Sequence, residues 1–243
     1  MTSLPHAPNA SYSYIGQELD LFARAVRWKA YFHATLAPYI RGDVLEVGAG
    51  IGQTTRYLCD GRQGSWTCLE PDPVLADRLA GDSAVHALVP TPCVTVGTTA
   101  TMTTQTGFDA ILYIDVLEHI EHDREELARA SELLAPGGSL IVLSPAFNFL
   151  FSEFDRSVGH FRRYTARSLA AVMPPWLRRR KLHYLDSIGF LASLANRALL
   201  RQSMPTSGQI ALWDGRMVPI SRALDPLVGH RFGRSVVAVY DRA

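Results

Sequence analysis

A glycine-rich turn at residues 44–55, with the sequence VLEVGAGIGQTT, sets the strongest limit on the fold. It follows a short apolar run and precedes a helix-like segment, and its glycines at 48, 50 and 52 allow a tight turn that a ligand can approach closely. The dinucleotide-binding form of this turn has its third glycine one position later, where this chain has Gln53. This departure argues against a nicotinamide or flavin cofactor and leaves another nucleoside ligand, or a turn without any ligand.

Strand-like and helix-like segments alternate along most of the chain. After an amphipathic helix at residues 18–39, we expect strands at residues 44–47, 65–69, 93–96, 110–114, 140–143, 181–185 and 235–240. We expect helices between them at residues 54–59, 74–79, 124–134 and 166–173. This alternation predicts an α/β fold, in which a mostly parallel sheet has helices on both faces and binds ligands at the carboxyl ends of its strands.

The length of the chain favours a single domain over residues 1–243. Residues 1–40 are predicted to form an N-terminal arm and a helical lid, and residues 41–185 the ligand-binding core. Residues 186–232 are interpreted as a lid insertion, with an apolar helix at 188–200, before the last strand at 233–243. The segment 147–163 has no clear period, so we predict a loop there, at the mouth of the site.

Composition excludes several classes of protein. The apolar content of 47% excludes a disordered chain, and the net charge of +1 argues against a general nucleic-acid binder. The three cysteines form no C-x-x-C pair, which argues against a disulfide scaffold or a cysteine-rich zinc site and predicts a cytoplasmic protein. No apolar run reaches the ~18 residues of a membrane span, and the N-terminal residues lack the pattern of a secretory leader.

Glu70 adds a second ligand-binding signal, because it ends the second predicted strand about twenty residues after the glycine-rich turn. A carboxylate at this place can accept hydrogen bonds from both hydroxyl groups of a ribose. The alternative is that Glu70 only supports the start of the helix that follows. Together with the glycine-rich turn, ribose binding is the favoured interpretation.

Four segments in order resemble the motifs of class I S-adenosylmethionine-dependent methyltransferases: VLEVGAGIG, LEPD, FDAILYIDVLEHI and LLAPGGSLIVLSPA. A further segment, DRSVGHFRRYT at residues 155–165, is similar to the D-x-x-x-G-H-x-R-R-Y-T segment of a bacterial branch of small-molecule methyltransferases. The resemblance covers roughly residues 12–185. It implies a Rossmann-like, seven-stranded, mostly parallel sheet, S-adenosylmethionine as the cofactor, and methyl transfer as the activity. The apolar, aromatic lid segments at 12–40 and 186–232 favour a small-molecule acceptor, with a role in secondary metabolism.

The resemblance also implies which residues bind the cofactor. The methionine end would face the glycine-rich turn and the segment after the fourth strand, the ribose would meet Glu70, and the adenine would lie at the turns after the second and third strands. Tyr14 would close over the cofactor, although an exposed or core tyrosine fits the sequence equally well. The implied cofactor set is Tyr14, Glu46, Gly48, Ala49, Gly50, Gly52, Glu70, Pro71, Thr98, Thr99, Asp115, Val116 and His119.

Residues that act on the acceptor are predicted in the segment after the fifth strand. His160 is the candidate catalytic base, because imidazole titrates near neutral pH, but it could equally cap a helix or hold the loop by hydrogen bonds. Two arginines could bind an anionic group of the acceptor, or one of them could pair with Asp155. The predicted acceptor contacts are Phe147, Arg162, Arg163 and Tyr164.

No metal is expected at the site. His119 and His122 have the H-x-x-H spacing of two ligands on one helical face, but transfer of a sulfonium methyl group needs no Lewis acid. The basic run at 178–181 could touch RNA or an anionic membrane surface, but we expect a solvated turn there, and we expect Arg234 at the surface. The alternatives are an RNA or protein methyltransferase and a non-methylating S-adenosylmethionine-binding protein of the same fold. The acceptor, the methylated atom and the oligomeric state stay open.

Overall fold

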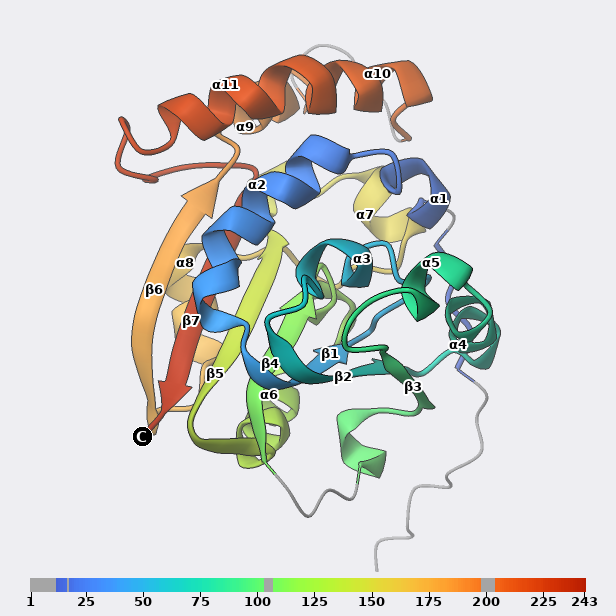
Figure 1. The fold of residues 1–243 in the computed structure, drawn as a ribbon. Helices are drawn as coiled ribbons and strands as arrows, with labels where there is room; N and C mark the ends of the chain where they lie inside the picture. The colour runs from blue at the N-terminus through green and yellow to red at the C-terminus, as the bar shows by residue number, and fades with distance from the viewer. Residues whose placement is uncertain (1–11, 17, 103–106, 198–203) are drawn as a thin grey trace, which may run out of the picture.

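The computed structural model describes residues 12–16, 18–102, 107–197 and 204–243. Its centre is a seven-stranded sheet with the order β3-β2-β1-β4-β5-β7-β6, in which β7 runs antiparallel to both neighbours and the other pairs inside the sheet are parallel (Figure 1). The predicted Rossmann-like, mostly parallel sheet is therefore confirmed. The strands are β1 (Gly42–Val47), β2 (Gln63–Glu70), β3 (Cys93–Val96), β4 (Phe108–Ile114), β5 (Leu134–Pro145), β6 (Leu177–Leu185) and β7 (Ser235–Arg242).

Helices cover both faces of the sheet, because successive side chains of each strand point to opposite sides. Leu112 of β4 packs on one face against Phe32 and Leu58 of the covering helices, and Tyr113 packs on the other face against Leu127. The first face is covered by α2 (Val26–Leu36), α3 (Thr55–Leu58), α4 (Pro73–Ala80) and α5 (Ser83–His86), and the second by α6 (Asp123–Glu132) and α8 (Ala166–Val172).

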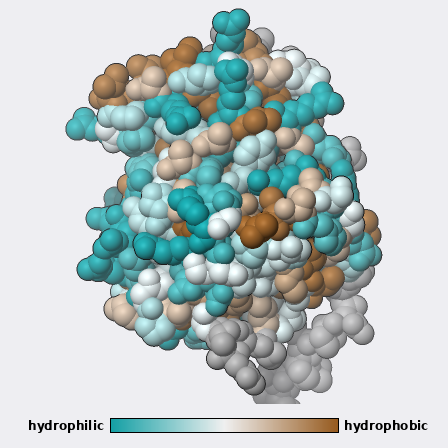
Figure 2. Space-filling model, in the orientation of Figure 1, coloured by the Kyte–Doolittle hydropathy of each residue, from teal (hydrophilic) through white to brown (hydrophobic). Residues whose placement is uncertain are grey.

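The insertion before the last strand is helical and lies above the carboxyl ends of β5 and β6 (Figure 1). Its elements are α9 (Ser187–Ala195), α10 (Ser207–Leu212), the π-helical turn η6 (Trp213–Met217) and α11 (Val218–Leu224). The last two contact α2, and Trp213 and Val218 join the buried cluster around that helix. Figure 2 shows hydrophobic residues along the outer side of α10 and α11, where Leu212 and Ile220 are exposed. The end of the helix predicted at 188–200 lies outside the described residues, as does most of the N-terminal arm.

The helix predicted at residues 18–39 is wrong as a single element. It is divided into α1 (Leu19–Phe22) and α2, with a break before Val26. Beside this break, the buried ammonium group of Lys29 donates hydrogen bonds to the carbonyl oxygens of Phe22 at 2.6 Å and Ala23 at 3.3 Å. These carbonyls would otherwise continue the helix, so the side chain of Lys29 stabilises the break.

Two other local predictions were also wrong. The segment 147–163 is not a plain loop, because it contains the short helices η4 (Asn148–Leu150) and α7 (Glu153–Ser157). The basic run at 178–181 is not a turn but part of the edge strand β6, with exposed arginine side chains at 178–180. In the described part of the chain, no helix has both the length and the apolar character needed to cross a membrane.

Candidate active site

The glycine-rich turn leaves β1 at the point where the strand order reverses between β1 and β4. Gly48, Gly50 and Gly52 have positive φ angles of 66°, 56° and 74°. A Cβ atom on Gly48 would lie 2.7 Å from Val116, and one on Gly52 would lie 2.4 Å from Leu79. At Gly50 the nearest atom is a side-chain carbon at 3.9 Å. The turn is therefore closely packed on its protein side and open toward the cavity it lines.

Glu70, at the end of β2, fixes this turn in place. Its Oε2 atom accepts the N–H of Gly50 at 2.7 Å, and its Oε1 atom accepts the N–H of Asp72 at 3.0 Å. Burial raises the pKa of Glu70, although these two N–H groups oppose the shift. Asp72 in turn accepts the N–H of Tyr14 at 2.7 Å, so that one chain of hydrogen bonds joins the glycine-rich turn, the end of β2 and the N-terminal segment.

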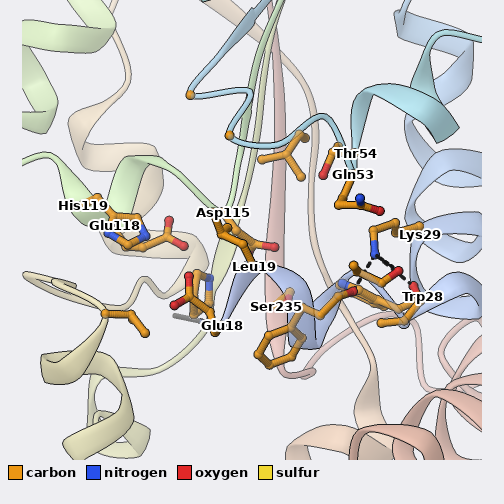
Figure 3. A pocket seen from close by; sticks show the side chains of 18 of the residues that line it. Glu18, Leu19, Trp28, Lys29, Gln53, Thr54, Asp115, Glu118, His119 and Ser235 are labelled. Carbon is orange, nitrogen blue, oxygen red and sulfur yellow. Dashed lines mark hydrogen bonds between the residues drawn. The ribbon is translucent and has the colours of Figure 1, made fainter. Parts of the chain in front are cut away.

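A cavity of about 210 Å³ lies beside the turn, between the ends of β4 and β5 and the N-terminal helices. Figure 3 shows Glu118 and His119 at one end, Lys29 at the other and Asp115 between them. Its apolar walls include the aromatic side chains of Phe22, Trp28, Phe32, Phe154 and Trp213. Of the residues predicted from the sequence, the cavity is lined by Tyr14, Gly48, Ala49, Gly50, Asp115, His119, His160 and Arg163.

Asp155 organises one wall of the cavity. Its Oδ1 atom lies 2.9 Å from Nδ1 of His160, and its two oxygens accept hydrogen bonds from Arg163 at 2.7 and 2.9 Å. Burial acts to raise the pKa of Asp155, but the hydrogen bonds from His160 and Arg163 outweigh it and hold the pKa well below its usual range. Asp155 is thus an anion that orients the imidazole ring, and Arg163 is committed to it.

Glu118 and Asp115 are two further acidic groups that line the cavity. Glu118 is fully buried; its Oε2 atom accepts the hydroxyl of Ser144 at 2.9 Å, while Oε1 has no hydrogen-bond partner among the described residues. Burial raises the pKa of Glu118 well above its usual value, and the charge of Asp115 adds to the shift. Burial also raises the pKa of Asp115, against the charges of His160 and Arg234.

His119 completes this polar cluster. Its ring centre lies 4.5 Å from that of His160, with the planes at 84°, and 5.6 Å from the ring of Tyr14. Burial, together with the nearby His160, lowers the pKa of His119 to about 3, so its ring is neutral at physiological pH. His122, the other histidine of the H-x-x-H spacing, is exposed at the start of α6. The structure therefore brings His160, and not His122, to His119.

Comparison with known proteins gives a family match for the segment that supplies one side of this cavity. Residues 45–140, from β1 into β5, match the family model described as a methyltransferase domain. These residues are similar to a methyltransferase domain. The cofactor of this domain is S-adenosylmethionine, and the glycine-rich turn, Glu70 and Glu118 all lie inside the matched range. A search of curated proteins gives no match.

Solved structures with the same fold span nearly the whole chain. The Haloferax volcanii chain solved in complex with the methyltransferase activator Trm112 aligns with a TM-score of 0.63 at 15% identity, over 93% of this chain and 94% of that one. N-methyltransferase NodS from Bradyrhizobium japonicum, solved with S-adenosyl-L-homocysteine, aligns with a TM-score of 0.56 at 15% identity, over 90% and 88% of the two chains. The [4+2]-cyclase SpnF aligns with a TM-score of 0.58 at 15% identity, over 88% and 81%. Such identities establish the fold, and these proteins show that it hosts different activities.

Three predicted acceptor contacts lie outside the cavity lining. Arg162 forms an ion pair with Asp123 at 2.7 Å, and the hydroxyl of Tyr164 donates to the same carboxylate at 2.6 Å. Phe147 stacks on Tyr184 with ring centres 4.9 Å apart. These side chains anchor the segment after β5 from behind, so that His160 and Arg163 alone among its predicted site residues reach the cavity.

Several predicted cofactor residues also lie behind the lining. Glu46 is buried beneath the turn, where its Oε2 atom accepts the hydroxyl of Thr55 at 2.7 Å and the indole N–H of Trp66 at 3.0 Å. Burial raises the pKa of Glu46 to about 7. Thr99 donates its hydroxyl to Glu126. The predicted cofactor residues that are absent from the cavity lining are Glu46, Gly52, Glu70, Pro71, Thr98, Thr99 and Val116.

Three residues that line the cavity were not predicted in the cofactor or acceptor site: Lys29, Arg234 and Glu118. Burial lowers the pKa of Lys29 to about 8. The available signal was that Lys29 is the only lysine in the predicted amphipathic helix at 18–39. Arg234 was expected at the surface, which was wrong: its guanidinium carbon lies 4.4 Å from the ring centre of Trp213, beside the cavity. Nothing local marks Arg234, because the rings that pack on it, Phe22 and Trp213, are not its neighbours in the sequence.

Proposed function

We propose that this protein transfers the methyl group of S-adenosylmethionine to a small-molecule acceptor bound in the cavity. One observation carries the proposal: a single cavity is lined on one side by the glycine-rich turn and on the other by aromatic rings and by Glu118, His119 and His160. A cofactor on the turn and an acceptor against the rings would meet in one enclosed space. A role in secondary metabolism belongs to the same proposal and is supported by the resemblance of residues 155–165.

The residues around the turn fit the cofactor. Gly50 leaves open space above the turn, and a side chain there would begin to fill it. Each oxygen of Glu70 accepts one backbone N–H, from Gly50 or Asp72, and keeps a lone pair for a ribose hydroxyl. Tyr14, tied to Asp72 through its N–H, would close the N-terminal segment over the cofactor. Glu70 lies behind the cavity lining; besides Tyr14 and Gly50, the lining residues of the proposed cofactor site are Gly48, Ala49, Asp115 and His119.

Methyl transfer requires little more of the protein than a fixed position for the acceptor and the exclusion of water. When bound, S-adenosylmethionine supplies an electrophilic methyl carbon, toward which the acceptor must be held in line and away from water. Phe22, Trp28 and Trp213 provide the apolar walls that exclude water. His160 is the side chain that would assist the acceptor, because Asp155 holds its Nδ1 atom and its Nε2 atom is turned toward Glu118, 4.0 Å away.

The cavity favours a small acceptor over a macromolecule. It is small and mostly apolar, and the net charge of +1 gives no general attraction for a nucleic-acid backbone. The exposed arginines at 178–180 lie on β6, at the edge of the sheet, and line none of the cavity. An acceptor with an apolar or aromatic body fits these walls.

Calorimetry with S-adenosylmethionine and S-adenosylhomocysteine, followed by mass spectrometry of reactions with candidate acceptors, tests the proposal. We expect micromolar binding of both compounds and a methylated small-molecule product. Tight binding of NAD without binding of either compound would refute the cofactor site. Binding without any methylated product over a broad panel would instead favour a non-methylating protein, and methylation of RNA or protein would overturn the small-molecule acceptor.

A further inference from the structure

Three side chains at one end of the cavity present metal-ligating atoms to a common point. They are Glu118, His119 and His160, and their ligating atoms all lie within 4.8 Å of one another. We infer that these residues form a binding site for one divalent transition-metal ion, with imidazole and carboxylate ligands. The inference deepens the proposed function and rests on it for its role in catalysis, and it departs from the metal-free site expected from the sequence.

Each of the three side chains is held by a second group that leaves one ligating atom free. Ser144 holds Oε2 of Glu118, and Asp155 holds Nδ1 of His160, both at 2.9 Å. His119 is hydrogen-bonded to the backbone of Val158. Metal-binding histidines and carboxylates are characteristically oriented by such outer partners. The three side chains are therefore oriented in the way that metal ligands are.

The strongest evidence for a cation is the free carboxylate oxygen of Glu118. Oε1 of Glu118 is buried without a hydrogen-bond partner in the described part of the chain, and an unsatisfied buried acceptor is costly. Asp115, which lines the same cavity, brings a second acidic group near Glu118. The nearest arginine on this wall, Arg163, already pairs with Asp155. A divalent ion would satisfy the orphan oxygen and offset the repulsion between Glu118 and Asp115.

The distances between the three ligating atoms permit such an ion after the side chains move slightly closer together. Metal–ligand bonds of about 2.0–2.2 Å place neighbouring ligand atoms about 3.0–3.4 Å apart. Oε1 of Glu118 and Nε2 of His160 are 4.0 Å apart, and the widest pair is within 4.8 Å. Side-chain rotation of Glu118 and His119 can supply this movement of roughly 1–2 Å. The short helix that carries both residues, η3 (Leu117–His119), ends directly after His119 and does not restrict its ring.

The ligand set indicates the class of metal and its use. Two imidazoles and one carboxylate with open positions suit zinc, iron(II), manganese or cobalt better than magnesium, which prefers oxygen ligands alone. All three residues line the cavity, so the open positions face the proposed acceptor. The ion would bind an acceptor oxygen, lower its pKa and orient it toward the methyl group. His160 would then act as a ligand, and not as the base that takes the proton.

The sequence supplies matched controls, because Glu121 and His122 repeat Glu118 and His119 three residues later on the exposed surface. Chelator-treated full-length protein is titrated with Co²⁺, followed by its absorption spectrum, and with Zn²⁺, followed by calorimetry. We expect one ion per chain, with affinity lost by more than about 100-fold in Glu118→Gln and His119→Ala and unchanged in Glu121→Gln and His122→Ala. Ser144→Ala, which frees Glu118, should weaken binding by roughly 10- to 100-fold.

Binding of S-adenosylhomocysteine, measured in the same samples, separates this inference from the proposed function. Wild-type protein that binds S-adenosylhomocysteine but neither metal would overturn the metal site and leave the methyltransferase proposal standing. Metal binding that survives both Glu118→Gln and His119→Ala, or that is lost equally in His122→Ala, would also overturn it. Thermal unfolding of each variant confirms that the fold is intact, and Glu118→Gln preserves both the size of the side chain and an acceptor for Ser144.

Discussion

Glu70→Gln should weaken cofactor binding while leaving the shape of the side chain almost unchanged. In the structure, both carboxylate oxygens accept backbone N–H groups, from Gly50 at 2.7 Å and from Asp72 at 3.0 Å. The glutamine amide has one accepting oxygen and one donating NH₂ group. If its oxygen stays with Gly50, the NH₂ group faces the N–H of Asp72 and replaces an acceptor that a ribose hydroxyl would use.

The magnitude follows from the bonds that are lost. A hydrogen bond to a charged group contributes about 1.5–3 kcal/mol, and about 1.4 kcal/mol corresponds to tenfold in affinity. Loss of one ribose contact should therefore raise the Kd by about 10- to 140-fold. The lost bond to Asp72 should in addition lower the free energy of unfolding. Glu70→Ala, which loses every contact, should weaken binding at least as much.

Isothermal calorimetry with S-adenosylhomocysteine gives the Kd, and urea unfolding gives the stability of each variant. Glu125→Gln, an exposed substitution on α6, is the control and should leave both quantities unchanged. A Kd within twofold of the wild-type value in folded Glu70→Gln protein would refute the reasoning. Glu70 would then support the glycine-rich turn without touching the cofactor.

Three further predictions concern buried groups around the cavity. Burial raises the pKa of Glu46 from 4.5 to about 7, so the free energy of unfolding should fall as the pH rises through this window. Glu46→Gln should remove up to about 3 kcal/mol of that fall, measured by urea unfolding at pH 5 and pH 8. An equal pH dependence in both proteins would contradict this. His160→Asn should lower kcat by about 10²–10⁴ with little change in cofactor affinity, whereas near-normal turnover would make the ring a structural support. Lys29→Met should lower the free energy of unfolding by about 1.5–3 kcal/mol, because the carbonyls of Phe22 and Ala23 lose a charged donor; an unchanged urea midpoint would show that water replaces it.

The sheet was predictable because its strands carry their own signal. The strand at Cys93–Val96 was predicted with the same bounds that the structure has, and the seven strands were placed in order. The errors fell where pairing partners, and not local sequence, decide the conformation. β5 begins at Leu134, which was predicted as the last residue of the helix at 124–134, because Leu134 pairs with Phe108 of β4.

The start of β6 is a second case in which strand pairing, and not local sequence, decides the conformation. Arg178 and Arg179 pair with the backbone of β7, although three consecutive arginines give no strand signal. Charged side chains are typical of an edge strand, where they oppose pairing with another sheet. A charge run on its own could not distinguish this edge strand from a solvated turn, since only the position of β6 in the sheet order decides between them.

The candidate site was predictable in its strand-end positions and not in its long-range contacts. Asp115 and His119 follow β4 and line the cavity, as the position of their segment indicated. The H-x-x-H spacing places two histidines on one face only if a single helix contains both. Instead, η3 ends at His119 and α6 begins at Asp123, which leaves His122 between two helices and exposed. No spacing rule links His119 to His160, which a separate segment brings beside it.

The segment 155–165 contains many polar residues, but few of them line the cavity. Its charged groups form two separate systems, since His160 and Arg163 join Asp155 on the cavity side, while Arg162 and Tyr164 join Asp123 on the side of α6. The second system ties the segment to the helix that follows Glu118 and His119. Both systems therefore fix the same quantity, the position of the His160 ring relative to those two side chains. A proton acceptor and a metal ligand both need that position held, and the matched substitutions at residues 118, 119, 121 and 122 distinguish the two roles.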